Sequence, residues 1–563
     1  MSKATLAIYG IKDRNQLHYP AYTHDHNLCL MQDGRVLQYL QLERYTRRKY
    51  DNRLDLFLEE LIDKGLLQLP EEFDLVSVNA FVGNAFITSG GKLRFEANRR
   101  SHLTENLESA WGYYQYETWQ GRELEAYNCS QELAHIASCL PFYGAFQENS
   151  LLVHLDGAAS LSNFSAFLYK GGKIQLLEYG WETKYLANFY NDNALSFAMI
   201  GAAPGEHTSV PGKLMGYACW GQYRADIEQW LAEHNYFKEY WHREEEIFAS
   251  IAETFGLSIE SFNSTIPFWQ DVAATLQHIF SREVIDKFRQ LQQQTGARYL
   301  YYAGGCALNI VTNTQLLETG LFEQVYIPPC CNDSGLSLGA ASLCEWLKGN
   351  TIATHSPYLN TLGLIPSQQQ FSSELIADIA KLLMTGKVLG VCNGFGEAGP
   401  RALGNRSLLA LANDKKLAER VSIHIKKREW YRPIAPIMLA EIVQEVASTP
   451  IQPLAKYMLM DFLIKEEYRA ALAGVVHVNG TARIQVIESK DDNPLMYALL
   501  SQLYKEYGVL ALINTSFNVR GEPIIHRPEE ALAAMPRMGL DGVVIEYKLY
   551  LPDGLEEDRD LVR

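Results

Sequence analysis

The chain has 563 residues, of which 47% are hydrophobic and 21% charged, so it is too long for a single core and too apolar for a disordered protein. Its 50 Lys and Arg residues against 66 Asp and Glu residues give a net charge of −16, which argues against sequence-independent binding to nucleic acid or to anionic membranes. The sequence offers neither a secretion signal pattern at its start nor an uncharged run of bilayer length. We therefore expect a cytoplasmic protein whose partners are small molecules.

The first predicted elements form a three-strand unit that occurs twice. The strands are expected at residues 5–9, 27–31 and 36–42 and again at residues 151–155, 162–169 and 173–178. In each copy a turn joins the second strand to the third, Asp33-Gly34 first and Gly171-Gly172 later, and such turns are strong hairpin signals. A duplicated unit of this kind is typical of the actin and sugar-kinase (ASKHA) nucleotide-binding fold, whose glycine turns approach phosphate oxygens. We therefore predict an α/β fold with two similar halves facing a cleft.

The middle of the chain contains a helical region and then a linker. Residues 188–288 are rich in Tyr, Trp, Phe, Glu and Ala at helical spacing and are predicted to be mostly helical. A strand at residues 298–303 runs into Gly304-Gly305, which is typical of a nucleotide-contacting turn. From about residue 346 the sequence becomes polar and turn-rich. We predict a nucleotide-binding domain at residues 1–350, a linker at 351–370 and a second domain at 371–563.

The second domain combines helices, strands and unusually basic loops. Its helices are expected at residues 373–384 and 528–535 and its strands at 387–392, 509–513 and 542–546. The cations in its loops are Arg401, Arg406, Lys426, Lys427, Arg428, Arg432, Arg483 and Arg520. Solvated surface charge would not need the Gly, Pro and Asn residues that accompany these cations. The loops therefore predict a convergent pocket for an anion with phosphate or carboxylate oxygens.

Nine sequence strings taken together resemble one family. They are residues 399–407, 426–433, 477–483 and 514–523 in the second domain and residues 24–25, 43–49, 212–216, 303–309 and 333–340 in the first. In this order they are similar to the O-carbamoyltransferases of nodulation-factor and antibiotic tailoring, the NodU/CmcH type. That family resembles the threonylcarbamoyl-adenosine synthesis proteins, because it joins a kinase-like domain to a YrdC-like carbamoyl-handling domain. The resemblance spans nearly the whole chain.

The resemblance implies a two-step reaction. In the C-terminal domain carbamoyl phosphate loses its phosphate, and the carbamate attacks the α-phosphate of ATP to give carbamoyl-adenylate and pyrophosphate. Because free carbamate is unstable, the two domains would share a sheltered route. In the N-terminal domain a hydroxyl of a small natural product, such as a secondary metabolite, would then take the carbamoyl group.

The family's site residues carry over by motif. They are Arg401, Lys426, Arg432, Arg483 and Ser516 for carbamoyl phosphate, Asn518 and Arg520 for the shape of that pocket, and Lys49, Lys213, Gly304, Gly305 and Asn309 for the nucleotide. Arg401 and Lys426 are also expected to stabilise charge on the departing phosphate. His24 matches the family's histidine near the acceptor alcohol, where a neutral imidazole would take the hydroxyl proton.

The resemblance also implies a metal site, and this chain departs from it. The family places two histidines four residues apart on a helix, together with two aspartates. This chain offers Gln131, His135, Asp156 and Asp333, so glutamine stands where the first histidine is expected. An amide oxygen is a poorer transition-metal ligand than imidazole. The expected metal is therefore Mg²⁺ bound with ATP, with Fe²⁺ in doubt.

Alternatives to a carbamoyltransferase remain open at this point. The change at Gln131 also fits a non-catalytic relative that binds nucleotide through a degenerate metal site. A sugar kinase would explain the duplicated strands but would leave the basic loops unused. The acceptor alcohol cannot be read from the sequence, and a homodimer is expected only because dimers are the commonest oligomers.

The nine cysteines are too few and too scattered for a disulfide framework. Cys330 and Cys331 form the only local cluster in the sequence. No CxxC pattern or histidine accompanies them, so we predict buried apolar packing rather than redox or metal chemistry.

Overall fold

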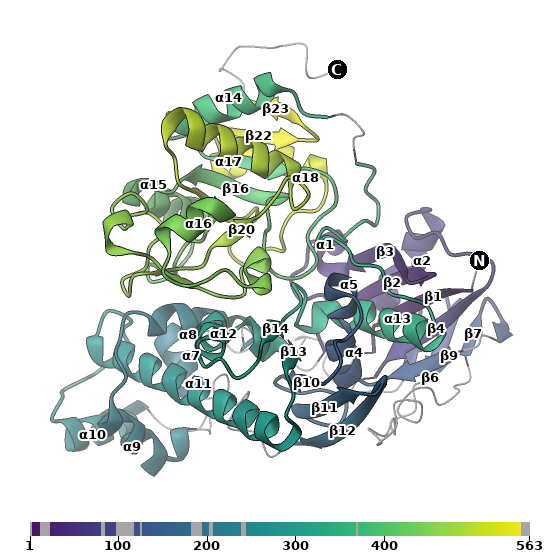
Figure 1. The fold of residues 1–563 in the computed structure, drawn as a ribbon, viewed down its shortest axis with the longest axis horizontal. Helices are drawn as coiled ribbons and strands as arrows, with labels where there is room; N and C mark the ends of the chain where they lie inside the picture. The colour runs from purple at the N-terminus through teal and green to yellow at the C-terminus, as the bar shows by residue number, and fades with distance from the viewer. Residues whose placement is uncertain are drawn as a thin grey trace.

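The computed structural model describes residues 3–11, 23–79, 85–96, 117–123, 126–181, 194–201, 207–237, 244–366 and 370–552. Two five-stranded sheets form the N-terminal part of the molecule, and a seven-stranded sheet forms the C-terminal part. The C-terminal part lies above the N-terminal part in Figure 1. Within these ranges, none of the helices is both long and apolar enough to cross a bilayer.

The two five-stranded sheets have the same topology. The first contains β1 (Ala4–Tyr9), β2 (Asn27–Gln32), β3 (Arg35–Gln41), β4 (Phe73–Val78) and β9 (Ala126–Cys129) in the order β3-β2-β1-β4-β9. The second contains β10 (Ser150–Leu155), β11 (Phe164–Lys170), β12 (Lys173–Gly180), β13 (Tyr299–Ala303) and β14 (Gln324–Tyr326) in the order β12-β11-β10-β13-β14. In each sheet three antiparallel strands are followed by two that run parallel to the first. The predicted duplication and the mixed α/β class are confirmed.

The hairpin turns of the two copies use the same backbone geometry. Asp33 and Gly34 have φ values of 50° and 72°, and Gly171 and Gly172 have φ values of 61° and 72°. Two successive positive φ values give the primed turn whose twist matches that of the flanking strands. The second and third strands of both halves therefore pair as the sequence predicts.

Two helices pack against each other between the sheets and bring distant segments together. Helix α4 (Gln131–Ala137) is buried throughout, and α13 (Leu336–Leu347) is buried over most of its length. Gly339 allows their close approach, because a Cβ at this position would lie 1.8 Å from the carbonyl oxygen of Ala134. This contact places His135 of α4 beside Asp333, which lies just before α13.

The C-terminal sheet has seven strands. They are β15 (Leu389–Cys392), β16 (Arg406–Leu411), β17 (Pro436–Leu439), β20 (Gln485–Ile487), β21 (Leu512–Ser516), β22 (Gly542–Ile545) and β23 (Lys548–Tyr550), in the order β20-β17-β21-β16-β15-β22-β23. Helix α14 (Ser373–Met384) has the predicted bounds, and α18 (Pro528–Met538) extends the predicted 528–535. Strands β16, β17 and β20 were not predicted, because they are short and begin within or beside the basic strings.

The remaining helices fill the space around the sheets. They are α1 (Leu42–Thr46), α2 (Leu54–Asp63), α5 (Leu140–Tyr143), α7 (Ala194–Ile200), α8 (Val210–Ala218), α9 (Ala225–Glu233), α10 (Glu244–Phe255), α11 (Pro267–Thr295), α12 (Ile310–Glu318), α15 (Lys415–Glu419), α16 (Ala440–Val446) and α17 (Pro494–Tyr507). Helices α7 to α11 confirm the helical region predicted at residues 188–288, over those of its residues that the structure describes. A small sheet contains β5 (Ala85–Ile87), β6 (Leu93–Glu96), β7 (Glu117–Trp119) and β8 (Arg122–Glu123).

The segment that joins the two parts is packed against the N-terminal part. The backbone N–H of Ala353 donates to Gly34 O at 2.9 Å, and that of His355 donates to Pro141 O at 2.7 Å. The side chain of Asn360 is fully buried and donates 2.6 Å to the carbonyl oxygen of Glu397. This part of the predicted linker therefore holds the two parts together.

Candidate functional site

Segments far apart in the sequence meet at the carboxyl ends of β1 and β10, the central strands of the two halves. Ligands of open α/β sheets bind at such strand ends. Tyr9 ends β1, Asp156 follows β10, and the hydroxyl of Tyr9 donates to Asp333 Oδ2 at 2.8 Å. The group defined here as the acid–histidine cluster consists of His24, Asp25, His135, Asp156 and Asp333.

His135 is oriented within this cluster by its second ring nitrogen. Nδ1 lies 3.1 Å from the carbonyl oxygen of Cys331, so Nε2 faces Asp333 Oδ1 at 3.4 Å and Asp156 Oδ2 at 3.6 Å. The ring is fully buried, and among the described residues Nε2 has no hydrogen-bond partner. One imidazole nitrogen and two carboxylate oxygens at these separations fit around a single divalent cation. The expected ligands His135, Asp156 and Asp333 are therefore brought together.

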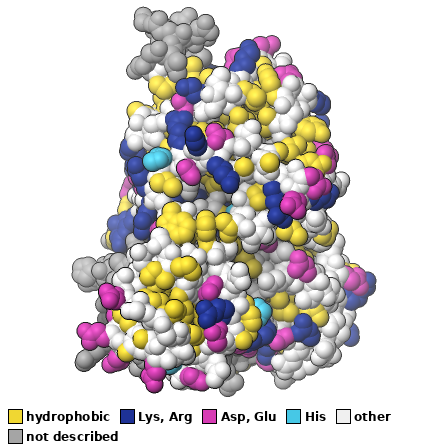
Figure 2. Space-filling model, turned by 90° about the vertical axis from the view of Figure 1, so that its left-hand side faces the viewer, with side chains coloured by type: hydrophobic (Ala, Val, Ile, Leu, Met, Phe, Trp, Pro, Cys, Tyr) yellow, Lys and Arg dark blue, Asp and Glu magenta, His cyan; other side chains and the backbone are white. Residues whose placement is uncertain are grey.

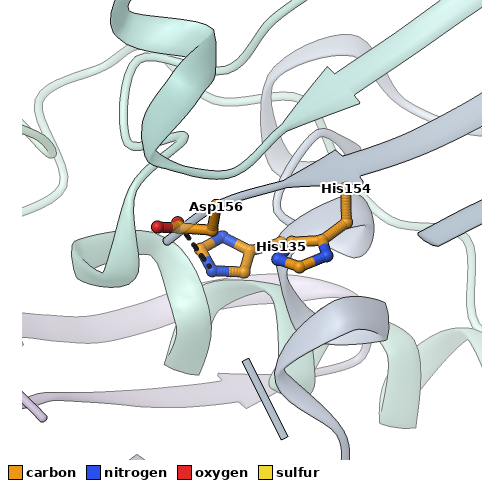
Figure 3. Close-up of side chains that lie close together, drawn as sticks. All are labelled: His135, His154 and Asp156. Carbon is orange, nitrogen blue, oxygen red and sulfur yellow. Dashed lines mark ion pairs between the residues drawn. The ribbon is translucent and has the colours of Figure 1, made fainter. Parts of the chain in front are cut away.

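His154, which the sequence did not point out, packs against His135. The ring centroids are 5.0 Å apart and the planes differ by 24°. Figure 3 shows His154 on the opposite side of His135 from Asp156, and the three residues offer ligand atoms within 4.8 Å of one another. Burial, and then the charge of His135, lower the pKa of His154 well below its usual value. His154 is therefore neutral, and its ring supports that of His135.

Gln131 is connected to this cluster through a tyrosine. Its Nε2 donates to the Tyr9 hydroxyl at 3.2 Å, and that hydroxyl donates to Asp333. The neighbouring carboxylate of Glu132 accepts from the backbone N–H of Leu161 at 2.7 Å and from the Ser162 hydroxyl at 3.0 Å. A hydrogen-bonded path through Tyr9 to Asp333 thus begins at Gln131, the position where the resemblance leads us to expect a histidine.

His24 lies beside two carboxylates. Its Nδ1 is 3.0 Å from Asp25 Oδ2 and 3.9 Å from Asp333 Oδ2. Burial opposes the charged form, but Asp333, Asp25 and Asp156 outweigh it and raise the pKa of His24 to about 9. These carboxylates therefore favour the imidazolium form of His24, and its role as a neutral base stays a prediction. Its ring can donate a hydrogen bond or a proton.

The glycine turn after β13 lies directly against this cluster. The backbone N–H of Gly305 donates to Asp156 Oδ2 at 2.5 Å. Gly304 has φ of 104°, and a Cβ there would lie 2.1 Å from Leu155 O. Asn309 caps α12 by accepting from the Thr312 N–H at 3.1 Å, and its amide donates to Gln277 at 3.1 Å. The two glycines therefore border the acid–histidine cluster, whereas the amide of Asn309 stabilises the start of α12.

The basic strings of the C-terminal part converge on a second cluster. The group defined here as the cation cluster consists of Arg401, Lys426, Arg428, Arg432 and Arg483. Burial, and then Arg401, Arg428 and Arg432, lower the pKa of Arg483 well below its usual value. Within the described part of the chain, Nε of Arg401 and Nε of Arg483 are buried without a hydrogen-bond partner. Because arginine stays protonated in proteins, these features indicate like charges crowded together and open to an anion.

Exposed charge on this protein has a different arrangement. Figure 2 shows Lys and Arg side chains interspersed with Asp and Glu on one face of the molecule. Surface cations of that kind are balanced by their neighbours and by solvent. Solvated surface charge, the alternative explanation of the basic strings, therefore does not describe the cation cluster.

Lys426 is held by the turn that carries two other predicted residues. Its Nζ donates to Ser516 Oγ at 3.0 Å, to Asn518 Oδ1 at 2.5 Å and to Asn518 O at 2.6 Å, and it also contacts Ser516 O. Burial, and then Arg428, Lys49 and Arg432, lower the pKa of Lys426. Ser516 and Asn518 therefore lie at the cluster and fix the position of its lysine.

The remaining predicted cations lie at the edge of the cation cluster. Lys213 of α8 and Arg520 both pair with Glu429 Oε1, at 3.2 Å and 3.4 Å. Nζ of Lys49 lies 5.1 Å from the ring centre of Tyr50. The positive charge of Lys49 contributes to the lowered pKa of Lys426. The nucleotide candidates therefore divide between two places: Gly304 and Gly305 at the acid–histidine cluster, and Lys49 and Lys213 beside the cation cluster.

The two clusters adjoin through the segment that contains Cys330 and Cys331. A Cβ on Gly399 would lie 2.1 Å from the carbonyl oxygen of Pro329. Burial raises the pKa of the Cys331 thiol to about 12, against the opposing charge of Arg401 nearby. The Cys331 carbonyl oxygen also faces His135. The cysteines are buried and free, and Cys331 separates Arg401 from the metal-ligand candidates.

Besides His154, three residues of the site received no role in the sequence analysis. Arg428 and Glu429 lie inside the basic string 426–433, so their spacing could have placed them with Lys426 and Arg432. Tyr9 gives no local signal, because it is the last residue of an apolar strand whose contact partner Asp333 is 324 positions away.

Comparison with protein families gives two matches that together span most of the chain. The profile described as Carbamoyltransferase N-terminus matches residues 114–342, and the profile described as Carbamoyltransferase C-terminus matches residues 380–551. The first match includes His135, Asp156 and Asp333, and the second includes every member of the cation cluster.

Similar proteins cover nearly the whole chain. Nodulation protein NolNO of Sinorhizobium fredii is 29% identical over 94% of this chain and 79% of its own length. Nodulation protein U of the same species is 28% identical over 89% of this chain and 93% of its own length. Among solved structures, full-length HypF in its phosphate- and nucleotide-bound form matches 63% of this chain and 57% of its own, with 12% identity and a TM-score of 0.30.

Proposed function

Because the chain belongs to the carbamoyltransferase family, we propose that this carbamoyltransferase hydrolyses carbamoyl phosphate to carbamate and phosphate and joins the carbamate to ATP, giving carbamoyl-adenylate and pyrophosphate. It then transfers the carbamoyl group to a hydroxyl of a small natural product and releases AMP. In this proposal residues 371–563 form a YrdC-like domain that handles carbamoyl phosphate, and residues 1–350 carry out the transfer. Residues 351–370 connect the two.

The cation cluster is the observation that carries this proposal. Carbamoyl phosphate is a small dianion, and phosphate oxygens match the planar donor set of arginine. The buried Nε atoms of Arg401 and Arg483, which have no hydrogen-bond partner among the described residues, supply donors for it. As phosphate leaves, negative charge grows on its oxygens, and fixed cations stabilise that charge. Lys426, already held by Ser516 and Asn518, would contribute a fixed charge rather than a mobile donor.

The acid–histidine cluster supports the transfer step. His135, Asp156 and Asp333 would hold a divalent cation, which when bound supplies Lewis-acid polarisation of an oxygen. Mg²⁺ accompanying ATP suits the carboxylates, and Fe²⁺ would suit the imidazole. With the charge of Asp156 and Asp333 neutralised by that cation, His24 in its neutral form would take the proton of the attacking hydroxyl as AMP leaves. The path from Gln131 through Tyr9 keeps Asp333 oriented for both partners.

The test is mass spectrometry of the purified protein incubated with ATP, Mg²⁺ and carbamoyl phosphate, without an acceptor. We expect carbamoyl-adenylate in the tube, and pyrophosphate release that needs carbamoyl phosphate. A parallel tube with Fe²⁺ asks whether Gln131 still permits iron, and Arg282→Ala, in a surface ion pair with Glu228, is the matched control for cluster variants. Release of ADP instead of carbamoyl-adenylate and pyrophosphate would contradict the proposal.

A second candidate is a relative that binds nucleotide but does not complete the reaction. The observation in its favour is the amide of Gln131, which is hydrogen-bonded to Tyr9 where the family has a metal-binding histidine. Such a relative would bind ATP in calorimetry but would form neither carbamoyl-adenylate nor pyrophosphate in any metal-supplemented tube.

A further inference from the structure

A single carboxylate lies among three cations where the N-terminal and C-terminal parts meet. Glu429 Oε1 is 3.2 Å from Lys213 Nζ and 3.4 Å from Arg520 Nη2. Its other oxygen, Oε2, is 3.7 Å from Arg432 Nη1. Both carboxylate oxygens are buried. Glu429 is therefore held by one cation from the N-terminal part and two from the C-terminal part.

The helix that carries Lys213 is docked on the segment that carries Glu429. A Cβ on Gly216 would lie 3.1 Å from Pro433 Cδ, so α8 approaches the segment closely. The indole N–H of Trp220, just after α8, donates to Tyr431 O at 3.1 Å. The rings of Tyr217 and Tyr431 lie 4.9 Å apart. Lys213 is thus fixed by packing at the place where it meets Glu429.

The same segment supplies much of the cation cluster. Lys426, Arg428 and Arg432 lie within six residues on either side of Glu429 along the chain, and Arg520 donates its backbone N–H to Lys426 O at 3.2 Å. A carboxylate beside so many cations reduces their mutual repulsion and sets the direction of the side chains that pair with it. Because Lys213 holds it from the other part of the molecule, its position depends on how the two parts are docked.

We propose that Glu429 is a positioning residue: anchored by Lys213, it holds Arg432 and Arg520 in the geometry that binds carbamoyl phosphate. The inference rests on the proposed function for the identity of the anion. The proposal also places Lys213 at the contact between the two parts, instead of the nucleotide-binding role expected from the sequence. The relevant chemistry is that of a phosphate dianion, which would meet Arg432 on the side away from Glu429.

The first experiment measures carbamoyl phosphate dependence of pyrophosphate release for Glu429→Gln. We expect KM for carbamoyl phosphate to rise about tenfold, as for loss of one charged contact, while kcat changes less than about threefold. Glu429→Asp should recover part of the loss, because it keeps the charge. Glu228→Gln is the matched control, since it removes a carboxylate from the ion pair with Arg282 on the helices of the N-terminal part and should leave KM unchanged.

The second experiment tests the anchor. Lys213→Met should raise the same KM by a smaller factor, and the double variant Lys213→Met with Glu429→Gln should be no worse than Glu429→Gln alone, because the two residues act through one contact. Independent, multiplying effects would overturn the anchoring role. Thermal unfolding of each variant checks that the proteins are folded.

A third measurement separates this inference from the proposed function. Calorimetric titration of wild type and Glu429→Gln with inorganic phosphate needs no turnover. Weaker phosphate binding by Glu429→Gln supports the positioning role even if wild type makes no carbamoyl-adenylate. Unchanged or tighter binding overturns it, and tighter binding would mean that Glu429 competes with the anion.

Discussion

The acid–histidine cluster and the cation cluster compensate their charge in opposite ways. In the first, His24 and His135 face the carboxylates of Asp25, Asp156 and Asp333 at ion-pair distances, so positive and negative groups are already paired. In the second, four arginines and Lys426 lie close together, and the carboxylate of Glu429 acts on Arg428 and Arg432. The first cluster offers oxygens to a cation, whereas the second offers donors to an anion, as the proposed function requires.

This difference shows how each cluster can be recognised from physical chemistry alone. Burial, and then crowding by other cations, lowers the pKa of Arg483 and of Lys426, and an anionic ligand relieves the repulsion between cations. The pKa of a histidine that is paired with carboxylates shifts in the opposite direction. The pKa of His24 rises to about 9 because the carboxylates outweigh burial. Removing one member should therefore affect phosphate chemistry in one cluster and metal affinity in the other.

The largest expected effect is at the centre of the cation cluster. Arg483→Ala removes a partly buried guanidinium whose Nε lacks a hydrogen-bond partner among the described residues. We expect kcat/KM for carbamoyl phosphate in pyrophosphate release to fall about 10²–10³-fold, as when a fixed donor to a developing oxyanion is lost. Arg282→Ala, on the surface, should leave the rate unchanged. Full activity in Arg483→Ala would show that the anion binds elsewhere.

The next largest effect is expected at the acid–histidine cluster. His135→Ala removes the imidazole that faces Asp156 and Asp333, and Mn²⁺ affinity measured by titration should fall about 100-fold or more. Gln131→Ala removes only the hydrogen bond to Tyr9, so its effect should stay below about tenfold. Equal losses in the two variants would mean that Gln131 is itself a ligand.

The smallest expected effect is on the free energy of unfolding. Because each ligand should stabilise the protein through one cluster only, this effect distinguishes the two clusters. Inorganic phosphate at 100 times its Kd should stabilise wild type by about 2.7 kcal/mol, which for a chain of this length corresponds to a rise in Tm of roughly 2 °C. Arg483→Ala should lose this rise and His135→Ala should keep it, whereas stabilisation by Mn²⁺ should follow the reverse pattern. Thermal unfolding with each ligand provides the measurement. Loss of both effects in either variant would show that the clusters are not independent sites.

Much of the fold could be predicted because its signals are local. The turns Asp33-Gly34 and Gly171-Gly172 fix their hairpins through residues adjacent in the chain. Strands β16, β17 and β20 escaped prediction because their pairing partners, such as β21 for β16, lie far away in the sequence. Short strands next to charged strings carry too little periodicity to be recognised.

The residues of the candidate site divide in the same way, into those with a local sequence signal and those whose position depends on distant contacts. Arg401, Arg432 and Arg483 were predicted together, because each lies in a string whose glycine, proline or asparagine residues indicate a shaped loop, and the structure brings them together. Lys213 lies instead at Glu429, since a lysine in a glycine-containing string does not reveal which part of the molecule it faces. The charge of His24 could not be predicted either, because it depends on Asp333, more than 300 positions away.

The joint between the two parts has a consequence for how the protein unfolds. Gly399 lies close to the carbonyl oxygen of Pro329. Arg44 Nη2 donates to Gly399 O at 2.8 Å, and Asn313 Nδ2 donates to Leu459 O at 2.9 Å. These are buried contacts to main-chain atoms, so separating the parts would leave polar groups without partners. Calorimetry should therefore record one cooperative heat-absorption peak, and a fragment ending near residue 366 should be far less soluble than the whole chain.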